Sequence, residues 1–538
     1  MSAIKPRNTD YTTLSSGSNK NETGETIGGA ALKPLKSLKV ENNSFQTLEN
    51  PQKISETKEI AVESKSSDIT LTSEKKVSEN EVQTAVPQDY AREVKERKRQ
   101  KLIAKDEKLL NSDNWLKRNG HTLTYAGVFL FTLFVYFRPY ELIPGLSALS
   151  SMAWILAVAT LVIYLPTQFS TEGNLTVLST EVKCVLFMAA WAILTMPIAK
   201  NRALAWETFN DTFSKVVVIF IIMVNTLRTP ARLKGLMWLS IGIGVMLSYQ
   251  AIGLYRQGIF EAEGYRVQVD FGGMFGNPND LALHMVIFIP IALMLGVGAK
   301  NKILKIIYFA AAAMMAAGNM VTQSRGGFLG LIAISAALVW KLGRKQRLKT
   351  ILVSSVIGII VMTLAPGNYG LRVLSIFIPG LDAAGSSDQR SELLKQSIFV
   401  TLRNPWGIGI GNFPEVGLRN LQTHNAFTQV SSELGVLAFL AFVILIVSPL
   451  RKLAAVERRM FEAEDFSWIY YMSIGLQASI IGFMVSGFFG PVAYNWFVYY
   501  PIAYAVCLRR IYQTERGEKV IETEKQDGLR NYFKLQKA

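Results

Sequence analysis

The chain has 538 residues, of which 50% are hydrophobic, with a mean hydropathy of +0.23 and a formal net charge of +16. These values are typical of a membrane protein with several spans and a polar appendage. Much of the positive charge lies in short loops between apolar segments, where it determines the orientation of the protein in the membrane, so a nucleic-acid partner is not expected. The two cysteines, Cys184 and Cys507, lie inside apolar segments, which excludes a disulfide framework and a thiolate metal cluster.

The N-terminal region differs sharply from the rest of the chain. Residues 1 to about 90 are rich in Ser, Thr, Asn, Lys and Glu and carry almost no aromatic side chains. Such a segment cannot bury enough apolar surface to offset chain entropy, so we expect it to be disordered. A cation-rich run with helical spacing follows at 91–110, and it is either an amphipathic helix on an anionic leaflet or a solvated juxtamembrane helix. We assign 1–115 and 511–538 to cytoplasmic tails.

Residues 116–510 contain about twelve apolar segments, which predict an all-α polytopic membrane protein. The segments are centred on Leu123–Phe137, Met152–Tyr164, Cys184–Ile198, Phe213–Leu227, Leu236–Leu254, Leu281–Val297, Ile306–Val321, Gly327–Trp340, Ile351–Leu364, Leu434–Val447, Trp468–Phe488 and Val492–Leu508. Several are shorter than the ~20 residues that a span needs, so we expect their helices to extend into the flanking polar residues.

The loops after even-numbered spans carry most of the loop cations, as cytoplasmic loops do. They include Arg228, Arg232, Lys234, Lys300, Lys302, Lys305, Lys341, Arg344, Lys345, Arg347, Lys349, Arg451, Lys452, Arg458, Arg459, Arg509 and Arg510. The loop after the second span is the exception, with little charge beyond Lys183. This alternation predicts that both termini are cytoplasmic.

Two connections on the non-cytoplasmic side exceed ordinary turn length, one over about 255–280 and one over 366–425. Long loops in compact proteins are usually functional or disordered. The second contains an amphipathic stretch at 391–402 and a glycine-dense turn at 404–413. We therefore expect an ordered extracytoplasmic loop, with a short helix lying along the membrane and then a tight turn.

Three arginines are expected on this same face, each in or beside a Gly-, Asn- or Pro-rich setting. Arg266 precedes a turn in which Asn277 and Asn279 flank a proline at the start of the sixth span, and Arg325 lies between the seventh and eighth spans. Arg390 precedes the amphipathic stretch. Guanidinium groups in such positions favour an anionic substrate, a phosphate above all. The alternatives are a surface arginine near lipid headgroups for Arg266 and snorkelling for Arg325.

His424 is the one histidine of the large outer loop, and it is followed by Asn425 and, nine positions on, by Glu433. A lone histidine is more often structural than catalytic, so its position is what makes it a candidate. The remaining histidines, His121 and His284, are far from it in sequence and there is no paired cysteine, which argues against a zinc site. No Walker A, G-x-S-x-G or H-E-x-x-H pattern is present, and the turn GIGIGNF follows no predicted strand, which excludes a dinucleotide fold.

Taken together, these motifs resemble the O-antigen ligase and O-antigen polymerase superfamily. The resemblance rests on GGMFGNPNDLA, TQSRGGFLGL, DQR followed by NPWGIGIGNF, and HNAFTQVSSELGVLAF, and it covers roughly residues 120–510. It implies a GT-C-type glycosyltransferase of the bacterial inner membrane, acting at the extracytoplasmic face with an undecaprenyl-diphosphate-linked glycan as donor. The acceptor would be a glycan, a lipid or a protein, and in the ligases no metal takes part. No cofactor is expected. Direct attack of the acceptor on the anomeric carbon would invert its configuration.

The resemblance also implies roles for individual residues. Arg325 and Arg390 would bind the diphosphate, with Arg266 as a further candidate, and His424 would act in acceptor activation. Asn277, Asn279, Asn412 and Asn425 are candidate substrate-binding residues on the same motifs. Ligase and polymerase share these motifs, so the choice between them stays open.

Two other functions are open at this stage. A transporter or flippase for an anionic substrate would explain cations that face a cavity, but it predicts internal repeats and polar groups at the membrane midplane. A membrane scaffold would explain the long tail and leave the outer arginines without a role.

Overall fold

The computed structural model describes residues 96–97, 100–101, 115–138, 151–260, 265–269, 275–345, 347–348, 351–352, 355, 358 and 386–516. All of them lie in one compact unit that begins at Thr84. The tail predicted to be disordered, most of the ninth predicted span, the first part of the large outer loop and the C-terminal tail from residue 517 on lie outside these residues.

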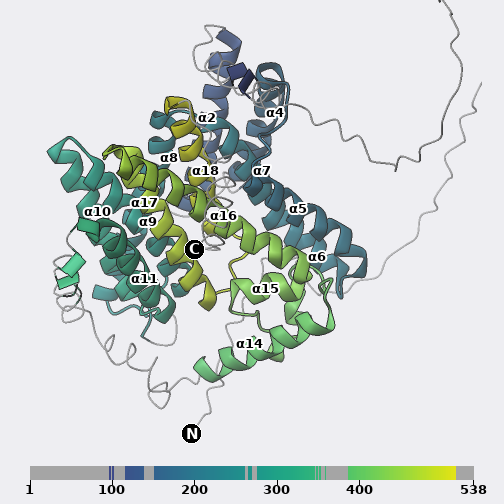
Figure 1. Ribbon diagram of the computed structural model, residues 1–538. Coiled ribbons are helices and arrows are strands. Elements are labelled where there is room, and N and C mark those ends of the chain that lie inside the picture. The colour runs from purple at the N-terminus through teal and green to yellow at the C-terminus, as the bar shows by residue number, and fades with distance from the viewer. Residues whose placement is uncertain are drawn as a thin grey trace, which may run out of the picture. The chain divides into compact units, whose positions relative to one another are not determined.

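The described residues fold into helices and form no strand (Figure 1). The α-helices are α2 (Trp115–Phe137), α4 (Met152–Glu172), α5 (Thr180–Thr195), α6 (Arg202–Thr208), α7 (Ser214–Thr226), α8 (Pro230–Arg256), α9 (Pro278–Gly298), α10 (Lys302–Val321), α11 (Arg325–Leu342), α14 (Ser386–Arg403), α15 (Ala426–Glu433), α16 (Gly435–Glu462), α17 (Trp468–Ser486) and α18 (Trp496–Arg516). The short elements are η2 (Met196–Ile198), η3 (Phe209–Phe213, a π-helix), η4 (Gly343–Lys345), η6 (Phe413–Glu415), η7 (Leu418–Asn420) and η8 (Gly487–Phe489).

Nine helices within the described ranges are long and apolar enough to cross a membrane, which confirms the all-helical polytopic class. Each coincides with a predicted span. The predicted spans at 213–227 and 492–508 fall on α7 and α18, which are helical but outside that set, and the span at 351–364 is largely undescribed. The count of twelve therefore stays a prediction.

The most buried span is α9, which packs against α8, α10, α11 and α17. Small residues let these helices approach closely, as is usual where no hydrophobic effect draws helices together. At Gly330 of α11, a Cβ would lie 2.1 Å from the Ser486 hydroxyl oxygen of α17. At Gly127 of α2, it would lie 2.2 Å from the Thr160 hydroxyl oxygen of α4. These contacts join α11 closely to α17 and α2 closely to α4.

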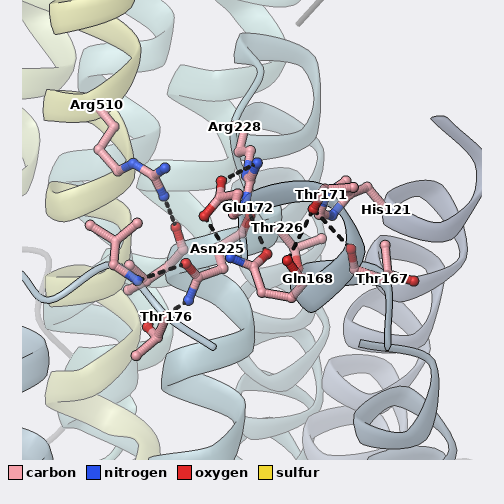
Figure 2. Close-up of polar contacts among 12 residues, drawn as sticks. His121, Thr167, Gln168, Thr171, Glu172, Thr176, Asn225, Thr226, Arg228 and Arg510 are labelled. Carbon is pink, nitrogen blue, oxygen red and sulfur yellow. Dashed lines mark hydrogen bonds and ion pairs between the residues drawn. The ribbon is translucent and has the colours of Figure 1, made fainter. Parts of the chain in front are cut away.

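Cations and buried carboxylates meet at the end of the helices where α8 and α10 begin. Figure 2 shows one such group: the Arg228 guanidinium forms an ion pair of 2.5 Å with Glu172 of α4 and donates to the Gln168 side chain at 2.9 Å. His121 of α2 contacts Thr171 at 3.2 Å, and Arg510 of α18 donates to a backbone carbonyl of α7. The group ties four helices together at one end.

Two further buried carboxylates at this end have cationic partners. Glu181 of α5 contacts Lys452 at 3.0 Å and Arg509 at 3.5 Å, and Glu457 of α16 contacts Lys341 at 2.6 Å. Several of the loop cations whose alternation predicts the membrane orientation therefore also join helices. The same contacts explain why α16 continues to Glu462, well beyond the predicted apolar segment.

Candidate functional site

Arg266, Asn279 and Ser324 meet at the end of the molecule where α9 and α11 begin, which we call the site end. The buried Arg266 guanidinium donates through Nη2 to Asn279 Oδ1 at 2.8 Å and through Nε to the Thr322 carbonyl at 3.3 Å. The Ser324 hydroxyl donates to the same Asn279 oxygen at 2.8 Å. The structure thus brings the predicted Arg266 and Asn279 together and adds Ser324, which the sequence analysis did not single out.

Local sequence explains why two helices begin here. Asn277 caps α9, because its side-chain oxygen accepts from the Asn279 backbone N–H at 2.9 Å and Pro278 occupies the first turn. Ser324 caps α11 by accepting from the Gly327 N–H at 3.2 Å. Asn277 is therefore placed as a cap, and its predicted substrate contact stays a prediction.

Arg325 is the first residue of α11 and is buried, with 9% of its surface exposed. A cation at a helix N-terminus opposes the helix dipole, so helix stability does not explain an arginine at this position. An anion bound there would interact favourably with both the guanidinium and the first backbone N–H groups. The position therefore suits an anionic ligand.

A small cleft lies between the beginnings of α9 and α11 and the short helix η8. Its lining includes Asn279, Asp280, Ser324, Phe489 and Gly490. Gly326 of α11 lets η8 approach, since a Cβ there would lie 2.8 Å from the Phe489 Cβ. The cleft thus adjoins the contact of Arg266 with Asn279 and Ser324.

The helix α15 also packs against η8. The Phe427 and Phe488 rings lie 6.3 Å apart between centroids, and the Gln429 side-chain oxygen accepts from the Ala493 N–H at 3.1 Å. Asn425 caps α15 by accepting from the N–H groups of Phe427 and Thr428. Three helix N-termini, those of α9, α11 and α15, are therefore arranged around η8.

His424 precedes this third N-terminus, in the left-handed region with a φ of 50°. Burial, and then the nearby Arg390 guanidinium, lower the pKa of His424 to about 4. Arg390 lies in the first part of α14, and this helix confirms that the amphipathic stretch is helical. The helix α14 contacts α15, where the Thr401 and Ser431 hydroxyl oxygens are 3.0 Å apart (Figure 1). The structure places His424 and Arg390 close enough to interact, and keeps the imidazole neutral at pH 7.

The glycine-dense turn wraps around a carboxylate at the other end of α15. Glu433 is fully buried, and its two oxygens accept from the Gly411 N–H at 2.8 Å and the Phe413 N–H at 3.3 Å. Burial raises the pKa of Glu433 to about 7, although both backbone donors act in the opposite direction. Glycines at 407, 409 and 411 have positive φ, which this path of the chain requires.

Asn412 lies within the same turn and is fully buried. Its side-chain oxygen accepts from the Asn201 N–H at 2.6 Å, and its amide nitrogen donates to the Ile410 carbonyl at 2.9 Å. Both ends of its side chain are therefore used within the protein. Asn425 also uses its oxygen internally, as the cap of α15, while its buried amide nitrogen has no hydrogen-bond partner among the described residues. Their predicted substrate contacts stay predictions.

The family model described as O-antigen ligase matches residues 310–443. No curated protein matches the chain. The matched segment contains α11, α14, α15 and the glycine-dense turn, so it includes Arg325, Arg390 and His424 and excludes Arg266 and Asn279. The match confirms the resemblance inferred from the sequence motifs, and with the apolar helices it indicates a bacterial membrane protein of polysaccharide biosynthesis.

Proposed function

We propose that this chain, whose residues 310–443 match the O-antigen ligase family, is a membrane glycosyltransferase that transfers or polymerises a glycan from an undecaprenyl-diphosphate donor. The observation that carries the proposal is the arrangement of three helix N-termini around η8, with Arg266 and Arg325 beside two of them and Arg390 near the third. Such a site suits a diphosphate, because helix N-termini and guanidinium groups both favour negative charge.

The chemistry of the leaving group fits this arrangement. As the glycosidic bond to the diphosphate breaks, negative charge builds on the leaving phosphate. Arg266 is held by Asn279 and the Thr322 carbonyl before any substrate binds, so its guanidinium needs little reorganisation. Arg325, at the start of α11, would contact the same diphosphate. Direct attack by the acceptor on the anomeric carbon would invert its configuration.

The acceptor hydroxyl must lose its proton during transfer. His424 is neutral at pH 7, which leaves one ring nitrogen able to accept a hydrogen bond, and Arg390 lies near it. We assign His424 to acceptor activation on this basis. The donor would lie at the extracytoplasmic face of the inner membrane, with both termini in the cytoplasm, as the alternation of loop cations predicts.

The transporter alternative needs polar groups along a path at the membrane midplane. His284 lies in the second turn of the span α9, and aromatic rings surround it: Phe288 at 4.6 Å, Phe275 at 5.3 Å and Tyr136 at 5.5 Å between ring centroids. Dense packing of this kind favours a structural histidine over a substrate path.

Purified protein reconstituted with a lipid-linked glycan tests the proposal. The donor would be the undecaprenyl-diphosphate glycan that accumulates in cells lacking this protein, with membrane extract of the same cells as the source of acceptor. We expect release of undecaprenyl diphosphate together with a transferred or lengthened glycan, whose size separates ligase from polymerase. A transporter would move the intact donor between leaflets and release no undecaprenyl diphosphate.

A further inference from the structure

The C-terminal half of α14, together with the turn that follows it, exposes large apolar side chains. The exposed fraction is 77% for Leu402, 56% for Trp406, 52% for Phe399 and 47% for Ile398. Leu402 is the most exposed large hydrophobic residue in the part of the chain that the structure describes. We call these four residues the apolar patch. Exposed apolar side chains that are grouped in this way mark a binding surface.

One exposed stripe of α14 changes from polar to apolar along the helix. Ser391, Lys395, Ile398 and Leu402 follow one another at helical spacing, and all four are exposed. The opposite side of the helix is buried, with Leu393 packed against residues of the glycine-dense turn. Such a stripe suits a helix whose first half faces water and whose second half enters an apolar medium.

Two contacts join the apolar patch to the helices α5 and α16. The Trp406 ring lies 5.9 Å from the Trp191 ring of α5 between centroids. The carbonyl of Pro405 accepts from the Val436 N–H, in the first turn of α16, at 2.9 Å. Both α5 and α16 are long and apolar enough to cross a membrane. The apolar patch therefore lies beside the point where one span ends and another begins.

The exposed sides of these two spans are also apolar beside the patch. They include Ile193 and Leu194 in the last turn of α5, and Val436, Leu437 and Leu440 in the first turns of α16. Exposed apolar side chains on a span face the acyl chains of lipids. The apolar patch thus continues a surface that lipid covers, and this continuity identifies what the patch binds.

We infer that the C-terminal half of α14 docks on the membrane, with the apolar patch among the phospholipid acyl chains of the leaflet at the site end. Trp406 would lie at the membrane–water interface, where tryptophan is enriched. Arg403 lies beside the patch with its guanidinium 4.4 Å from the centroid of the Phe399 ring, and a side chain of this length can reach the lipid headgroups.

Docking of this half would fix the depth of the whole helix relative to the membrane. Arg390 lies 12 positions before Leu402, so the two are about 18 Å apart along the helix axis. The end of α14 that carries Arg390 would then stay on the polar side of the interface. This inference does not depend on the proposed function, because it concerns a lipid surface and not a substrate.

Spin labels on single cysteines test the docking of α14. Cys184 and Cys507, both buried, are first replaced by alanine, and the label is then attached in Leu402→Cys, Ser391→Cys or Ile444→Cys. Full-length protein is placed in vesicles of phosphatidylethanolamine and phosphatidylglycerol. Collisions of the label with oxygen, which concentrates among acyl chains, are compared with collisions with a water-soluble nickel chelate.

We expect the label at position 402 to collide mainly with oxygen, as the label at position 444 on the exposed side of the span α16 does. The label at position 391, on the same stripe of α14 as position 402, should collide mainly with the nickel chelate. If Leu402→Cys does not fold, as judged by its melting temperature, Phe399→Cys takes its place with the same expectation.

Two results would overturn this inference. Collision mainly with the nickel chelate at position 402 would show that the apolar patch faces water. Weak collision with both reagents there would show that protein covers the patch, either a second copy of this chain or another segment of it. The measurement uses no donor lipid and no transfer reaction, so neither result affects the proposed function, which fails separately if the protein releases no undecaprenyl diphosphate.

Discussion

Glu433→Gln replaces a buried carboxyl group, which can gain or lose a proton, with an amide of nearly the same shape, which cannot. The pKa of Glu433 is raised from 4.5 to about 7, so the folded protein holds a proton there that the unfolded chain has released. A shift of this size corresponds to about 3 kcal/mol. Because the folded state binds more protons, this contribution to stability is fully present below pH ~4.5 and is lost as the pH rises to about 7.

Thermal unfolding of purified protein, followed by tryptophan fluorescence between pH 4.5 and 8 at one heating rate, measures this effect. We expect the wild-type melting temperature to fall across that range, and the curve of Glu433→Gln to fall less. The glutamine should be less stable at low pH by about 1–3 kcal/mol, because its NH₂ group faces one of the two backbone donors, Gly411 or Phe413.

The matched control for this experiment is Glu415→Gln, which changes an exposed carboxylate that accepts from Asn201 in the same part of the molecule. The melting temperature of Glu415→Gln should depend on pH in the same way as that of the wild type. Parallel curves for Glu433→Gln as well would refute the reasoning, because they would mean that the buried carboxyl group does not take up a proton on folding.

Three further predictions concern the topology, the proposed base and the junction between α15 and α16. A cysteine in place of Gly385 should react with a membrane-impermeant thiol reagent added from outside the cell, and a cysteine in place of Lys345 should not. The reverse pattern would contradict the predicted topology and with it the proposed extracytoplasmic site. His424→Ala should slow transfer more than it weakens donor binding, and the wild-type rate should fall as the pH drops through about 4, where the imidazole becomes protonated; near-normal transfer would return this histidine to a structural role. Gly435→Ala places a Cβ 2.3 Å from the Pro405 carbonyl oxygen, at a φ of 80°. It should lower the melting temperature far more than Gly173→Ala, whose Cβ meets nothing within 4 Å, so that this control has only the cost of a positive φ, about 1–2 kcal/mol. Equal losses of melting temperature in the two variants would show that the contact at Gly435 is relieved easily.

The membrane helices are predictable from sequence because hydropathy over ~20 residues depends on composition and not on partners. The helix α14 was predictable as well, from its amphipathic pattern, and so was the start of α9, from its Asn-Pro pair. The end of α16 was not, because its polar second half is held in the protein by distant partners: Glu181 pairs with Lys452, and Lys341 pairs with Glu457.

The candidate site likewise has features that the sequence predicts and features that depend on distant segments. Arginines in glycine-rich settings stand out in the sequence, whereas the contact of Arg266 with Asn279 and Ser324 depends on three separate segments meeting. Glu433 was noticed for its distance from His424, but its role as the group around which the glycine turn folds depends on backbone N–H groups. Backbone donors have no signature in the sequence.

The central claim, that guanidinium groups at the site end stabilise the leaving diphosphate, is tested most directly by the rate of undecaprenyl diphosphate release in Arg→Lys variants. Lysine keeps the charge and loses the planar, two-pronged fit to phosphate oxygens. We expect Arg325→Lys and Arg390→Lys to slow release by about 10²–10³-fold at unchanged protein level, while Arg403→Lys, an exposed position on α14, stays at the wild-type rate. Full activity in Arg325→Lys and Arg390→Lys would contradict the account, because simple positive charge would then be enough.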